Sequence, residues 1–98
     1  MPTEFFQKNI NRLDEIYSQL ITGETEASEE VELRVEIIDI LSSLQAAVIS
    51  NEENNKDFIR LLENVRDNIL DWDPHGHWFR HQKELIDSIY EVIVQAKN

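Results

Sequence analysis

Hydrophobic residues recur along this chain at the alternating steps of three and four that are typical of one face of an α-helix. The first series follows Pro2 and Thr3, and its members are Phe6, Ile10, Leu13, Tyr17 and Leu20. The residues 22–25, which include Gly23, interrupt the series with turn-forming chemistry. We therefore predict a first helix that begins near Thr3 and ends at Thr22.

A second series runs from Ser28, a residue type that caps helix starts, to about Ser50. Its repeating positions are Leu33, Ile37, Leu41, Leu44 and Val48. Residues 31–37 also alternate between hydrophobic and polar with a period of two and are rich in β-branched side chains, as a strand would be. We favour a helix here, because a lone strand would find no partner elsewhere in the chain.

Two further segments follow the same helical pattern. The third starts within the polar residues 51–55 and carries Phe58, Leu62, Val65, Ile69 and Trp72. The fourth follows the turn at Pro74 and Gly76 and runs to about Ala96, with a broad apolar face. Its apolar positions are Trp78, Phe79, Leu85, Ile86, Ile89, Tyr90, Val92, Ile93 and Ala96. Four amphipathic segments joined by short loops predict one all-α domain over residues 1–98, a small up-and-down four-helix bundle.

The charge of the chain narrows the classes of partner. Twenty acidic residues against nine Lys and Arg give 98 residues a formal net charge of −11. Such a chain repels nucleic-acid phosphates and anionic membranes, so we expect neither partner and look instead for a basic protein. The absence of cysteine and of a basic, apolar leader at Met1 predicts a cytoplasmic protein without disulfides.

The negative charge lies in the first three quarters of the chain, since residues 74–98 are neutral, and residues 28–50 hold five acidic residues and one basic residue, Arg34. Four of these acids recur at steps of three, four and three and would form one edge of the helix, here called the acidic edge: Glu29, Glu32, Glu36 and Asp39. Like charges at this spacing destabilise a helix, and the sequence offers only Arg34 to compensate them. The acidic edge therefore predicts a surface that steers a cationic partner, although solvated acidic faces also simply keep small proteins soluble.

An unusual loop separates the third and fourth segments. Residues 71–81 contain both tryptophans and all three histidines. Trp72 and Trp78 fall on apolar stripes and would close one end of the core, or else serve with Arg80 as binding anchors. His77 and His81 lie one helical turn apart and form a weak candidate metal site, because the Glu of an H-E-x-x-H motif is absent.

No catalytic motif is present: the chain lacks a cysteine nucleophile, a glycine-rich phosphate loop and a G-x-S-x-G turn. The acidic residues are predicted to face solvent, where carboxylates do not acquire the shifted pKa that acid and base catalysis requires. We therefore expect a protein that is not an enzyme and that binds no cofactor.

Two functions fit these features. The first is an acidic inhibitor of the immunity or antitoxin type, which covers the basic surface of a partner enzyme such as a nuclease toxin. Size, charge and architecture are similar to those of helical bacterial immunity proteins, and a DNA mimic of the phage type is a variant of the same idea. The second is a structural or regulatory module, a homodimer or small subunit, that uses the neutral fourth helix as its interface. The chain would be a monomer in the first case.

Overall fold

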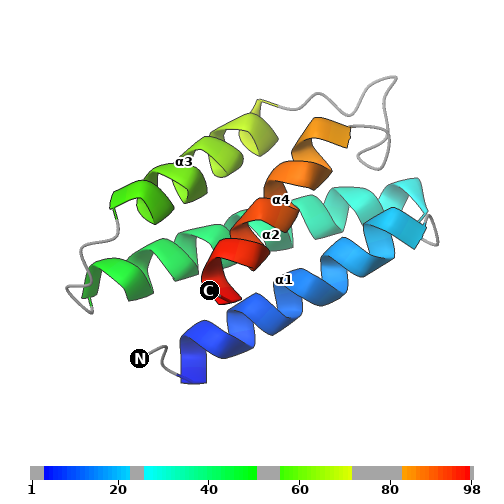
Figure 1. Cartoon of the computed structure of the whole chain (residues 1–98). Coiled ribbons are helices and arrows are strands. Elements are labelled where there is room, and N and C mark those ends of the chain that lie inside the picture. Colours follow the sequence, from blue (N-terminus) through cyan, green and yellow to red (C-terminus); the bar gives the residue numbers. More distant parts are fainter. Residues whose placement is uncertain (1–3, 23–25, 51–55, 72–82, 98) are drawn as a thin grey trace.

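The computed structural model describes residues 4–22, 26–50, 56–71 and 83–97, which form four helices (Figure 1). Helix α1 spans Glu4–Thr22, α2 spans Ala27–Ser50, α3 spans Lys56–Leu70 and α4 spans Lys83–Lys97. The predicted all-α four-helix bundle is confirmed. Residues 31–37 lie inside α2, so the alternative of a strand at this position is wrong.

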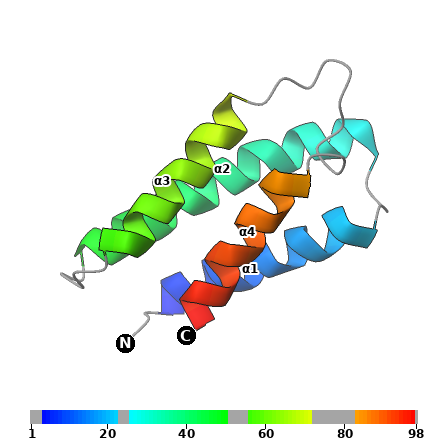
Figure 2. The same ribbon diagram turned by 45° about the horizontal axis from the view of Figure 1, so that its top comes forward.

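The helices pack in a ring in chain order. Each helix runs antiparallel to the next one, and α4 returns against α1, which closes the ring (Figures 1 and 2). Helices α2 and α4 therefore occupy opposite corners of a bundle with extents of 41 × 22 × 19 Å. The connections of four residues between α1 and α2 and of five between α2 and α3 leave these neighbours little choice but to lie antiparallel, whereas twelve residues separate α3 from α4.

The hydrophobic core is built from the predicted stripes. All five residues predicted on the stripe of α2 are buried, and so are four of those predicted on α3. The buried cluster consists of Ile10, Leu13, Ile16, Leu20, Leu33, Ile37, Ile40, Leu41, Leu44, Val48, Phe58, Leu62, Val65, Ile69, Ile86, Ile89, Val92 and Ile93. Burial of each such side chain stabilises the fold by roughly 1.5–3 kcal/mol before the cost of ordering the chain.

Aromatic residues tie the helices together at the margins of this core. The Phe6 and Phe58 rings lie 6.3 Å apart and join α1 to α3. The Tyr17 and Tyr90 rings lie 5.2 Å apart and join α1 to α4. Tyr90 remains half exposed. The apolar residues Ile86, Ile89, Val92 and Ile93 of α4 are buried, so most of the apolar face in the described part of the fourth helix packs within the bundle.

Helix starts carry the negative charge that the helix dipole favours. Glu29 lies in the first turn of α2, Asp57 in that of α3 and Glu84 in that of α4. Helix α2 begins one residue before the predicted cap, Ser28, which therefore lies in the first turn. None of the helices in the described ranges combines the length and the apolar character needed to cross a lipid bilayer.

Candidate interaction surface

The acidic edge follows the side of α2 that faces away from the core. Its members Glu29, Glu32 and Asp39 are exposed to solvent, whereas Glu36 is only partly exposed. The three exposed carboxylates are spaced along more than two turns of one helix, so they present negative charge over a continuous strip of surface. This strip can attract cationic groups before contact is made.

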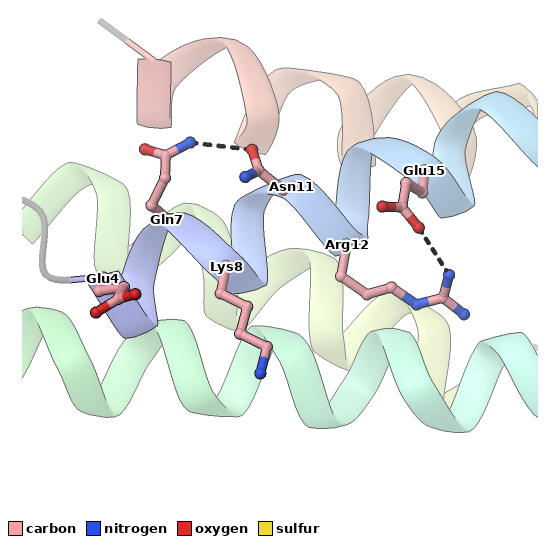
Figure 3. Close-up of a pocket in the computed structure, with 6 residues that line it drawn as sticks. All are labelled: Glu4, Gln7, Lys8, Asn11, Arg12 and Glu15. Carbon is pink, nitrogen blue, oxygen red and sulfur yellow. Dashed lines mark hydrogen bonds and ion pairs between the residues drawn. The ribbon is translucent and has the colours of Figure 1, made fainter.

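Glu36 departs from the prediction because a base from another helix neutralises it. Arg12 on α1 forms a bidentate pair with Glu36, in which Nη2 donates to Oε1 at 2.9 Å and Nε donates to Oε2. The same guanidinium also contacts Glu15, with 3.2 Å between Nη1 and Oε2 (Figure 3). The expectation that Arg34 is the only compensating base is therefore wrong, since the first helix supplies a second one.

The pair leaves its mark on the ionisation of both groups. Hydrogen bonds from Arg12 lower the pKa of Glu36 below its ordinary value, against a smaller opposing effect of burial. The hydrogen bonds that Arg12 donates to Glu36 likewise raise the pKa of Arg12 above its ordinary value. With one guanidinium between two carboxylates, the cluster still carries a net negative charge at neutral pH.

Arg34 has a structural task at the end of α3. Its Nε donates to the carbonyl oxygen of Ile69 and its Nη2 to that of Leu70, both at 3.1 Å. Those carbonyls belong to the last turn of α3, where backbone acceptors lack helical partners and the helix dipole is negative. Arg34 thereby fixes α2 against α3, a role that sequence spacing alone did not indicate.

The neighbouring helix α3 also carries exposed carboxylates. Helices α2 and α3 pack side by side, and Gln45 on α2 donates to Glu63 on α3 at 3.0 Å. On α3, Asp57, Asp67 and Asp71 are exposed. Helix α3 itself is balanced, because Lys56–Leu70 holds three acidic and three basic residues, and Nε of Arg66 lies 3.8 Å from Oδ1 of Asp67.

Exposed aliphatic side chains lie beside the acids on α2, and the sequence pattern did not identify them as candidate site residues. Val31 is 42% exposed and Val35 is 53% exposed, one turn apart on the same helix. The period-two alternation of residues 31–37 reflects these two valines, and on the sequence alone it indicates only an alternative strand. In the helix, Leu33 and Ile37 face the core while Val31 and Val35 face outward.

One carboxylate contradicts the expectation that the acidic residues face solvent. Glu30 is 1% exposed and lies on the core side of α2. Its backbone N–H donates to the carbonyl oxygen of Glu26 at 3.0 Å, which begins the hydrogen bonding of the helix. Glu30 therefore adds nothing to the negative surface of the molecule.

The candidate residues of the loop lie outside the described residues. This applies to the proposed anchors Trp72, Trp78 and Arg80 and to the weak metal candidates His77 and His81. In the part of the chain that the structure describes, no three His, Cys, Asp or Glu side chains are grouped as a metal site would require. Both roles of the loop remain predictions.

A shallow hollow of about 420 Å³ lies on α1 (Figure 3). All of its lining residues come from this single helix: Glu4, Gln7, Lys8, Asn11, Arg12 and Glu15. Gln7 donates to Asn11 at 3.0 Å, so its polar groups bond mainly to one another. A hollow on one helix surface encloses no ligand, and it offers no water-excluded setting for chemistry.

No protein-family model, curated protein or solved structure matches this chain.

Proposed function

We propose that this protein is an acidic inhibitor of the immunity or antitoxin type, which binds a cationic enzyme and covers its basic surface. A nuclease is the natural target, because an enzyme that binds nucleic acid must present Lys and Arg to phosphate. Carboxylates on a rigid helix compete for those same cationic groups.

The observation that carries the proposal is the exposed part of the acidic edge. Glu29, Glu32 and Asp39 project from one helix that is anchored on both sides, by Arg12 toward α1 and by Arg34 toward α3. The backbone positions of these three residues are therefore fixed before a partner binds, which lowers the entropy lost on binding. The neutralised Glu36 contributes to this anchoring rather than to partner recognition.

The alternative, a homodimer or small subunit that uses α4, has less surface to support it. Ile86, Ile89 and Ile93 of α4 are buried in the bundle. The large hydrophobic side chains that α4 leaves exposed in its described residues are Tyr90 and Val94. Stable dimer interfaces bury far more apolar area than two side chains provide.

Affinity capture followed by an activity assay tests the proposal. The tagged full chain is incubated with a lysate of its source organism at low salt, and retained proteins are eluted with a salt gradient. We expect a basic nuclease in the eluate, whose activity falls to zero as the chain is added back in equimolar amount. Retention of no basic enzyme, or of one that keeps full activity with the chain in excess, would contradict the proposal.

A matched pair of variants then locates the binding surface. The double variant Glu32→Lys and Asp39→Lys changes two charges on α2, and Asp87→Lys with Glu91→Lys changes the same number on α4 at the opposite corner. We expect the α2 variant to slow association at least about tenfold and the α4 variant to change it by less than about twofold. Equal effects of the two variants would mean that net charge, and no particular face, governs binding.

A further inference from the structure

Helix α2 carries a second hydrophobic stripe that begins at the margin of its core stripe and extends onto the exposed side of the helix. The outer stripe, defined as Val31, Val35 and Ile38, has the same steps of four and three as a helix interface. Val31 and Val35 are about half exposed, and Ile38 is partly buried at the margin of the core. Ser42 and Ile49, both exposed, continue the line along the helix. A bundle helix with only one buried face is ordinarily polar on its outer side.

Charged groups border this stripe on one side. Glu32 precedes Val35 by three residues, Asp39 follows it by four, and both are exposed. On a helix, residues at these spacings are neighbours on the surface, so the aliphatic contact area has carboxylates directly beside it. A partner that covers the stripe must therefore place cationic groups along its own border.

This border makes a second copy of the chain a poor occupant. In an antiparallel two-fold pairing of α2 with its own copy centred on Val35, Asp39 of one copy would meet Glu32 of the other. Like charges opposed across an interface cost affinity. The carboxylates beside the stripe are instead complementary to a basic partner chain.

We propose that the outer stripe of α2 is the docking seam for a basic amphipathic helix of the partner, with aliphatic residues facing Val31, Val35 and Ile38. Lys or Arg residues of that helix pair with Glu32 and Asp39. This inference rests on the proposed function and names the element of the cationic partner that is recognised. The carboxylates guide association, while the aliphatic contacts slow dissociation.

A designed peptide tests the seam without the native partner. The probe is a fluorescein-labelled peptide of about 18 Leu and Lys residues, roughly five helical turns, with Leu on one face. A peptide of the same composition in scrambled order carries the same charge without an apolar face. Fluorescence anisotropy measures affinity, and amide chemical shifts of the full chain locate the bound peptide.

We expect the amphipathic peptide to bind at least about tenfold more tightly than the scrambled one and to shift amides of residues 31–39. The double variant Val31→Gln and Val35→Gln should weaken binding of the amphipathic peptide about tenfold, because it removes aliphatic area without changing charge. Ile21→Gln with Val94→Gln removes exposed aliphatic side chains from α1 and α4 and should leave the affinity unchanged.

Three outcomes would overturn the seam: equal affinity for the two peptides, shifts outside α2, or an equal loss in both glutamine variants. In each case the capture experiment can still succeed, and the inhibitor proposal would then rest on charge alone. Conversely, the peptide can bind the stripe as expected while no enzyme in the lysate is inhibited. That result would support the docking seam and contradict the inhibitor proposal. Sedimentation of the free chain adds one more decisive result, since a dimer abolished by Val35→Gln would replace the partner helix with a second copy.

Discussion

Arg12 shows how a single residue changes the meaning of a charge pattern. Its side chain and that of Glu36 are each 38% exposed, so water screens the pair and its contribution to stability is modest. The bidentate geometry fixes both side chains at the junction of α1 and α2. Glu36 is therefore a structural member of the acidic edge, and the exposed members are those available to a partner.

Replacement of Glu36 by Gln tests this role through its pH dependence. Because the pKa of Glu36 is lower in the folded chain than its ordinary value of 4.5, the pair stabilises the fold at pH 7. This stabilisation is lost as the pH falls below 4.5 and through the lowered pKa of the folded chain. We expect Glu36→Gln to reduce the free energy of unfolding by about 0.5–1 kcal/mol at pH 7 and to match the unmodified chain near pH 2, in urea titrations followed by circular dichroism.

A double-mutant cycle with Arg12→Gln provides the control for this measurement. If the two side chains act as a pair, the double variant loses less stability than the sum of the single variants. Additive losses at pH 7, or a deficit of Glu36→Gln that persists at the lowest pH, would show that the pair contributes no coupling energy.

At the scale of the element, α2 carries two hydrophobic stripes whose contributions to the free energy of unfolding can be compared directly. Ile37 is fully buried, whereas Val35, two residues earlier, is 53% exposed. We expect Ile37→Ala to cost about 2–5 kcal/mol of unfolding free energy, because it leaves a cavity in the core. Val35→Gln should change it by less than about 0.5 kcal/mol, since Gln is a good helix former and the site faces water. Similar losses in both variants, measured by urea unfolding, would mean that Val35 belongs to the core.

The predictable part of the fold lies within single elements. The steps of three and four identify five buried residues of α2 and the buried residues of α3, because burial on a helix follows its own period, although Ile40 of α2 is buried off that stripe. The Arg12–Glu36 pair joins residues that are 24 positions apart, so it depends on which helices are neighbours and how they are rotated. The period-two pattern of residues 31–37 was ambiguous for a related reason, since two helical stripes interleaved on one helix resemble one strand.

Arg34 offers a test of how one element secures another. Arg34→Ala removes both hydrogen bonds to the last turn of α3, and we expect a loss of about 1–2 kcal/mol in unfolding free energy. Arg34→Lys keeps the charge but cannot donate from a planar fork, so it should recover only part of that loss. Amide hydrogen exchange should quicken in the last turn of α3 in the alanine variant and less so in the lysine variant. Unchanged exchange at Ile69 and Leu70 would show that the end of α3 is held by other contacts.

Over the whole molecule, the concentration of charge opposes folding. A net charge of −11 on a body of 41 × 22 × 19 Å produces self-repulsion that salt screens. Of the four helices, α2 has the largest formal excess of acids, five against one base, although Arg12 of α1 neutralises Glu36, while α4 is close to neutral. A surface retained for binding at the expense of stability is common among functional sites.

Charge reversal on α2 tests whether the proposed binding surface lowers the stability of the fold. Reversing Glu32 and Asp39 to Lys removes repulsion where it is densest, so we expect the free energy of unfolding to rise by about 0.5–1 kcal/mol near 20 mM salt. The gain should shrink toward zero near 0.5 M salt, where the Debye length of about 4 Å screens exposed charges. Asp87→Lys with Glu91→Lys makes the same change in net charge on the more balanced α4 and should stabilise the chain less. If the α2 reversal destabilises the fold at low salt, those carboxylates already have cationic neighbours within the molecule, and the case for a partner that meets them is lost.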